Sequence, residues 1–274
     1  MKRIYTLLLS LLSVCVGYAQ TDGEEGKEKS VLGNTWEMLK EMSAYYSENL
    51  AMGCRIDSMI HDGMYMRAIE EIDSFQVKME NVWGRAMSET MYVHKGQVLA
   101  YLEEYEKIVE NADECLQLYN LENDVKTLSV LYEQKGLAYL NMKDYRMAVR
   151  SYERVVSYST QAEDTCSVAN AYCTMAYCYS SMNKSLLASS FYEKGFDKYE
   201  EYFNISRSYL LKHKLQVSGS EKNMHKSIFA NHLLGKALFE QKRGDKGVSK
   251  KYLRMSANCG SELAQREYRR LYGD

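Results

Sequence analysis

The stretch YEQKGLAYLNMKDYRMAVRSY, residues 132–152, contains the pattern that decides the fold. Its first half places a tyrosine three residues after Gly136, and its second half places one four residues after Ala148, so each half has a helical face. The polar residues between the halves end in Asp144, which is a good N-cap for a second helix. The stretch therefore predicts two antiparallel helices, which Gly136 and Ala148 allow to approach closely.

This pattern returns every 40 residues. Four positions recur in four copies, and these are Ile56, Gly96, Gly136 and Ala176, then Met59, Leu99, Tyr139 and Tyr179, then Ala68, Ile108, Ala148 and Ala188, then Ile72, Ala112, Tyr152 and Tyr192. Repetition at such a period is typical of solenoids, in which each helix pair buries its apolar face against its neighbours. We therefore predict an all-α fold, an α-solenoid of antiparallel helix pairs, with the period-40 repeats over residues 31–208.

The repeated residues resemble the tetratricopeptide repeat, which alternates large and small side chains on a helix A and a helix B. The positions that carry the resemblance best are Tyr132, Gly136, Tyr139, Tyr145, Ala148 and Tyr152. Two features differ from the family. The chain has no proline, so the family's terminal proline is missing, and the period is 40 where the family has about 34. Longer helices or longer turns are therefore expected.

The spacing breaks after residue 208. Residues 209–227 are interpreted as an insertion, with a helix around residues 205–214 and a loop at 218–221. Residues 228–274 then resemble a Sel1-like repeat, a relative of the tetratricopeptide unit, through LGKALF at 234–239 and ANCGSELA at 257–264. Its last stretch, Ser261 to Tyr272, is expected to form the polar capping helix that a solenoid needs.

The amino terminus has the order of a bacterial secretory signal peptide. Lys2 and Arg3 precede an apolar run at residues 4–16, and Ala19 offers a cleavage site, so residues 1–19 are predicted to be removed. An alternative interpretation uses residues 12–15 as a lipoprotein box, with a lipid on Cys15 as the one expected link to a membrane. Residues 20–30 are polar and are predicted to form a flexible tether. We therefore expect an exported protein, periplasmic or in the outer envelope.

The charge is unevenly distributed. Residues 20–203 hold 18 Lys and Arg against 31 Asp and Glu, whereas residues 204–274 hold 15 against 6. Charged outer faces of helices account for much of this, and an acidic array with a basic end would also suit a charged partner. Nucleic acid is not an expected partner, because export removes the protein from most of it.

No motif predicts a reaction centre. Six cysteines remain after the signal peptide without a CxxC, and a long-range disulfide is left open. The five histidines form no HExxH, and no nucleotide-binding or nucleophile motif is present. We therefore predict a protein that is not an enzyme and has no metal or cofactor.

The family resemblance implies a binding surface on the concave face that the A helices line. Carried onto this chain, its positions are Asp57, His61, Val93, Gln97, Tyr101, Glu133, Leu137, Asn141, Asn170, Tyr177 and Ser181. From these we predict a partner-binding set of Gln97, Tyr101, Leu137, Asn141, Asn170 and Tyr177. Such a mixture suits a groove that hydrogen-bonds a peptide and seats apolar side chains. The alternative for each residue is packing against the next repeat.

The leading functional hypothesis is a non-enzymatic scaffold of the cell envelope that binds a protein or peptide. A second hypothesis is the sensory or regulatory input module of an envelope signalling system. A third is an all-α envelope enzyme that acts on glycans.

Overall fold

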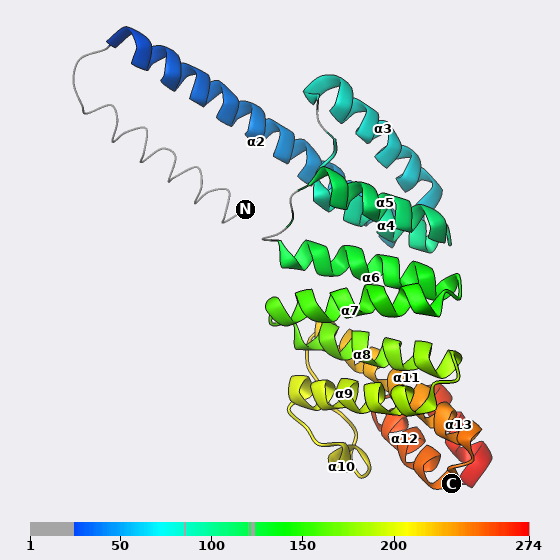
Figure 1. Ribbon diagram of the computed structural model, residues 1–274. Helices are drawn as coiled ribbons and strands as arrows, with labels where there is room; N and C mark the ends of the chain where they lie inside the picture. The colour runs from blue at the N-terminus through cyan, green and yellow to red at the C-terminus, as the bar shows by residue number, and fades with distance from the viewer. Residues whose placement is uncertain (1–24, 85, 120, 122–123, 274) are drawn as a thin grey trace. The chain divides into compact units, whose positions relative to one another are not determined.

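The computed structural model describes residues 25–84, 86–119, 121 and 124–273. Regular structure in these residues consists of helices and no strand, which confirms the predicted all-α class (Figure 1). The helices are α2 (Glu25–His61), α3 (Tyr65–Trp83), α4 (Glu89–Tyr101), α5 (Tyr105–Leu118), α6 (Val125–Asn141), α7 (Tyr145–Gln161), α8 (Thr165–Ser181), α9 (Ser185–Phe203), α10 (Arg207–Leu210), α11 (Ser220–Arg243), α12 (Lys246–Asn258) and α13 (Glu262–Tyr272). None of these helices has both the length and the hydropathy needed to cross a membrane.

The chain divides into two compact units, and the boundary falls after His94, inside α4. In the first unit α2 is 37 residues long and ends at the turn that the repeat pattern predicts. Because α2 begins at Glu25, residues 25–30 of the expected tether are helical, which fits the good helix propensity of their Glu and Lys residues. The predicted signal peptide, and the tether residues before Glu25, lie outside the described residues.

Polar side chains of α2 fix the segment that follows α3. The Tyr45 hydroxyl donates a hydrogen bond to the Ala86 carbonyl oxygen at 2.8 Å. The Asn49 side-chain oxygen accepts from the backbone N–H of Ser88, also at 2.8 Å. Asn49 is buried, so these bonds satisfy polar groups that would otherwise be costly to enclose.

The second unit is built from helices of regular length. Helices α5 to α9 begin at residues 105, 125, 145, 165 and 185, so one helix and one connection together take 20 residues. Helices α6 and α7 pack together as one antiparallel pair, and α8 and α9 pack as the next (Figure 1). A pair of such helices accounts for the 40-residue period of the sequence.

One backbone motif makes the turn between α6 and α7. Lys143 adopts a left-handed conformation with φ of 63°. Its N–H donates to the Leu140 carbonyl at 3.0 Å, and the N–H of Asp144 donates to the Tyr139 carbonyl at 2.9 Å. This arrangement is a Schellman motif, which satisfies the last carbonyls of a helix. The Asp144 side chain then accepts from the Met147 N–H at 3.1 Å and so caps α7, as predicted.

The same pair of backbone hydrogen bonds recurs along the chain. The residues in the left-handed position are Gly63, Glu103, Lys143, Glu163, Asn183, Asn204, Gly244 and Gly260. Five of them are not glycine, and such residues pay a steric cost there. Both residues of the motif donate through their N–H groups, so proline cannot stand at either position.

Side chains of alternating size fill the core of the second unit. A Cβ atom on Gly136 would lie 2.8 Å from a ring carbon of Tyr152, so the ring occupies the space that the missing side chain leaves. Further along, the aromatic rings of Tyr199 and Phe229 stack at 4.5 Å between centroids and join α9 to α11. The contact at Gly136 confirms the close approach of α6 and α7 that the small residues predict.

The connection after α9 differs from the expected insertion. The helix expected around residues 205–214 is the short α10, and the expected loop at 218–221 includes the start of α11 at Ser220. Asn258, which is 48 positions away in the sequence, fixes this connection. Its side-chain nitrogen donates to the Leu210 carbonyl at 2.7 Å. Helix α13 packs on α12 and is capped by Ser261, whose hydroxyl accepts from the Ala264 N–H.

Replacing Gly136 with alanine should lower the stability of the second unit by about 1–3 kcal/mol, because the buried Tyr152 ring must shift. The matched control is Gly247→Ala, also inside a helix, where the nearest atom to a new Cβ is 3.6 Å away. Alanine should stabilise that site by about 0.5–1 kcal/mol through helix propensity. Denaturant unfolding measures both, and equal effects would contradict this packing.

Glu163→Gly should raise stability by about 1 kcal/mol, because glycine adopts the left-handed conformation at the α7–α8 turn without steric cost. The reverse change, Gly244→Ala, should lower stability, although no atom lies within 4 Å of the new Cβ. Thermal melting of the two variants should therefore shift in opposite directions. Shifts in the same direction would show that backbone strain does not govern these turns.

Candidate partner-binding surface

Three apolar side chains stand exposed on successive A helices of the second unit. Tyr101 at the end of α4 is 52% exposed, Leu137 on α6 is 40% exposed and Tyr177 on α8 is 49% exposed. Leu137 and Tyr177 are 40 residues apart and take the same place in their helix pairs. Exposed apolar side chains of this size are available to a partner rather than used in the core.

The polar members of the predicted set differ from one another. Gln97 and Asn141 are exposed on α4 and α6, and the Asn141 side chain donates to the Leu137 carbonyl within its own helix. Asn170 on α8 is only partly exposed and is held between two other helices. Its nitrogen donates to Glu133 Oε1 on α6 at 3.0 Å, and its oxygen lies 2.8 Å from His232 Nε2 on α11.

The Glu133–Asn170–His232 chain links three helices of the second unit. Because Asn170 donates to a carboxylate, its oxygen is left as an acceptor, and His232 must carry a proton on Nε2. Burial raises the pKa of Glu133, and the hydrogen bond from Asn170 partly opposes that rise. Burial lowers the pKa of His232 to about 4, so the ring is neutral at pH 7. Asn170 therefore connects helices in this structure.

Of the other predicted concave positions, Asp57, His61 and Val93 lie in the first unit, and Ser181 is exposed at the end of α8 in the second. Asp57 on α2 lies 3.1 Å from His94 Nε2, and His61 is exposed at the end of α2.

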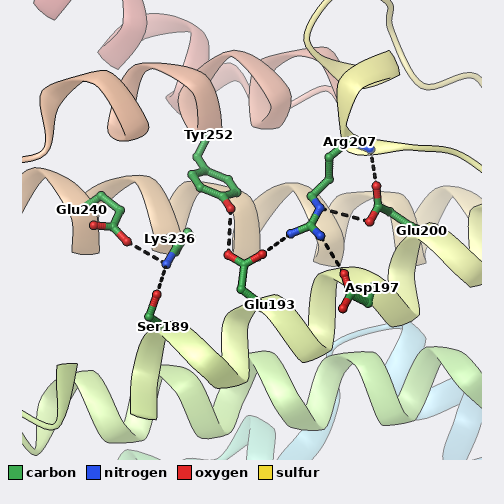
Figure 2. A network of polar contacts seen from close by, with 8 residues as sticks. All are labelled: Ser189, Glu193, Asp197, Glu200, Arg207, Lys236, Glu240 and Tyr252. Carbon is green, nitrogen blue, oxygen red and sulfur yellow. Dashed lines mark hydrogen bonds and ion pairs between the residues drawn. The ribbon is translucent and has the colours of Figure 1, made fainter. Parts of the chain in front are cut away.

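A network of charged side chains fixes the last helix pair to α9 (Figure 2). Arg207 binds three carboxylates of α9 at once, namely Glu193, Asp197 and Glu200. Glu193 also accepts a hydrogen bond from the Tyr252 hydroxyl of α12 at 3.1 Å. The planar guanidinium suits such multiple binding, so Arg207 anchors the connection that replaces the regular turn here.

Lys236 and Glu240 form a buried ion pair on α11. Their side chains are 3% and 4% exposed, and the Lys236 nitrogen lies 2.7 Å from Glu240 and 3.0 Å from the Ser189 hydroxyl. Lys236 directly follows Gly235, just as Leu137 directly follows Gly136. Lys236 on α11 is therefore equivalent in the repeat to Leu137 on α6, which is exposed. Figure 2 shows Lys236 directed at α9. We call Tyr101, Leu137 and Tyr177 the exposed row. Because the equivalent side chain on α11 is buried, the exposed row ends before the last helix pair.

The sequence predicts no reaction centre among the metal-ligating and thiol side chains of the described residues. No group of three or more His, Cys, Asp or Glu side chains in the described part of the chain is placed to hold a metal ion. The six cysteines beyond the predicted signal peptide are free thiols, of which Cys54 alone is exposed. Burial raises the pKa of Cys166, Cys178 and Cys259 to about 12, so these thiols are un-ionised at neutral pH.

A comparison with known protein families finds a match at one helix pair, α6 and α7. Residues 130–161 match the tetratricopeptide repeat. The matched segment runs from Val130, inside α6, to Gln161, the last residue of α7. The chain matches none of the curated proteins with which it was compared. Tetratricopeptide repeats generally mediate protein–protein interaction and are typically non-catalytic, and this chain carries one such repeat within an all-α array. The Sel1-like resemblance of α11 and α12 stays a prediction.

His232 should make stability depend on pH. Its pKa of about 4 lies below the usual 6.5, so the unfolded chain binds the proton more tightly and acidification from pH 6.5 to 4 favours unfolding. The slope from this group is at most about 1.4 kcal/mol per pH unit. In His232→Gln the slope should disappear, since glutamine can still donate to Asn170. Chemical unfolding at each pH measures the difference.

Glu133 provides the internal control for that measurement. Its raised pKa means that the folded state takes up a proton first, so acidification should stabilise this site. The His232→Gln variant should therefore tolerate mild acid better than the unaltered protein. A variant with the same pH profile as the unaltered protein would contradict the assignment.

Proposed function

We propose that the protein is a non-enzymatic scaffold that binds a peptide segment of a partner protein along the A helices of its second unit. The observation that carries the proposal is the exposed row of Tyr101, Leu137 and Tyr177, with Gln97 and Asn141 beside it. Tyrosine supplies apolar area and a hydroxyl at a small cost in side-chain entropy, which makes it a common anchor in interfaces. The tetratricopeptide match at α6 and α7 supports this use of the array.

The predicted signal peptide supports a location in the cell envelope. Lys2, Arg3 and the apolar residues 4–16 have the order of an export signal, with Ala19 as the cleavage site. We propose that the scaffold acts after export, in the periplasm or at the outer envelope. A lipid on Cys15 is the alternative that would tie it to a membrane.

The test is cross-linked capture from envelope extract with the double variant Tyr101→Ala/Tyr177→Ala. The control, Leu186→Ala/Leu187→Ala, also removes two exposed apolar side chains, but from α9. The unaltered protein and the control should capture the same proteins, and the double variant should capture at least about fivefold less. The mass spectra also report the amino terminus, which should begin at Gln20.

Equal capture by all three proteins would contradict the peptide-binding row. The two double variants should melt at temperatures close to that of the unaltered protein, because exposed side chains contribute about 0.5 kcal/mol or less. A loss of capture with a matching loss of stability would therefore count against the proposal.

A further inference from the structure

An open pocket of about 400 Å³ lies where two successive turns of the second unit meet. The turn between α6 and α7 and the first two residues of α7 supply most of its lining, and Met182 in the turn between α8 and α9 supplies the rest. We call it the turn pocket, and its lining residues are Met142, Lys143, Asp144, Tyr145, Arg146 and Met182. The family match at residues 130–161 covers Met142 to Arg146, whereas the predicted A-helix set includes none of the lining residues.

The apolar part of the turn pocket rests on the core. Met182 and Tyr145 pack against the buried cluster that includes Ala148, Met175 and Cys178. Met142 is half-buried and lies 40 residues before Met182 in the repeat. Because the Schellman motif fixes the turn between α6 and α7, the pocket is formed before any ligand arrives. Methionine sulfur packs well against aromatic rings, so this surface favours an aromatic side chain.

The rim of the turn pocket carries two available cations. Within the described residues, no hydrogen bond or ion pair engages the side chain of Lys143 or Arg146, and both residues are exposed. The Asp144 carboxylate is the acidic group among the lining residues, and it already accepts from the Met147 N–H to cap α7. Arg150 is exposed and extends the positive charge by one helical turn, and its guanidinium donates to the sulfur of Met147 at 3.9 Å. The rim therefore favours a negatively charged ligand.

The turn pocket adjoins the exposed row. The rings of Tyr145 and Tyr177 meet edge to face, with centroids 6.5 Å apart and planes at 73°. Tyr145 lines the pocket and Tyr177 stands exposed on α8, so the two surfaces are continuous. A bound segment along the row would therefore reach the pocket at the carboxyl ends of α6 and α8.

We propose that the turn pocket seats an aromatic side chain of the partner and that acidic residues beside this side chain pair with Lys143 and Arg146. The inference rests on the proposed function and specifies its partner, which is an acidic peptide segment with an aromatic residue. A peptide fits better than a nucleic acid, because the floor consists of methionine and tyrosine and the cations stand only at the rim.

The experiment is fluorescence anisotropy with labelled peptides and the full chain. The probe is the peptide DDFDD, and DDSDD and KKFKK serve as probes without the aromatic ring or with the opposite charge. We expect DDFDD to bind, the other two to bind at least about tenfold more weakly, and added salt to weaken binding. No binding of DDFDD up to about 1 mM would overturn the proposal.

Variants of the lining residues show whether DDFDD binds at the turn pocket. Lys143→Glu/Arg146→Glu should weaken DDFDD at least about tenfold. The matched control, Lys251→Glu/Arg254→Glu on α12, changes the net charge equally at two exposed cations and should leave affinity unchanged. Met182→Ser should weaken DDFDD more than DDSDD. Equal losses in both charge variants would overturn the proposal, as would an oligonucleotide that binds with the same dependence on Lys143 and Arg146.

The capture experiment separates this inference from the proposed function. If Tyr101→Ala/Tyr177→Ala abolishes capture while Lys143→Glu/Arg146→Glu binds DDFDD normally, the turn pocket is excluded and the exposed row stands. If DDFDD depends on Lys143 and Arg146 while capture is unaffected by the tyrosine variants, the turn pocket stands and the row is excluded.

Discussion

The array depends on one backbone arrangement, the pair of N–H donations that closes α2, α4, α6 to α9, α11 and α12. At the α6–α7 turn the N–H groups of Lys143 and Asp144 donate back to the helix that ends, and Asp144 immediately caps the helix that begins. Three residues therefore reverse the chain with few unsatisfied backbone groups. Proline is excluded from both positions of this motif, because it has no N–H to donate. The same arrangement closes α6, α7 and α8, so their turns are equal in length and the helix length sets the 20-residue step.

Much of this could be predicted from residues close together in the chain. Gly136, Ala148 and Asp144 indicate a helix pair and its turn, because helical faces and N-caps are local properties. The connection after α9 could not be predicted in the same way. The short α10 is held by Arg207, which binds carboxylates of α9, and by Asn258 of α12, and these contacts join residues up to 48 positions apart. The helical start of the expected tether at Glu25 was also missed, because a polar composition suits both a linker and a solvated helix.

The candidate partner-binding surface could likewise be predicted from the sequence only in part. The repeat placed Leu137 and Tyr177 on equivalent exposed positions, because each is fixed by its own helix. It could not show that Asn170 lies between Glu133 and His232, since that chain requires α11 to pack on α8. The one hint was the presence of His232 and Lys236 within an otherwise apolar stretch. Lys236 is paired with the oppositely charged Glu240, and His232 is hydrogen-bonded to Asn170. Polar groups inside a protein usually have such partners, because an unpaired one is costly to bury.

These assignments limit where a partner can bind. The polar side chains near the last helix pair already have partners within the protein. Asn170 is bonded to His232, and Lys236 is paired with Glu240. Removing one member of either pair would leave the other without its partner. Leu137, Tyr177 and the lining of the turn pocket lie on α6 and α8, at the turns that follow them and at the start of α7. In the proposed function a partner binds at these exposed side chains and leaves the buried polar contacts in place. We therefore propose the carboxyl ends of α6 and α8 as the place where a partner binds, because Tyr177 adjoins Tyr145 there.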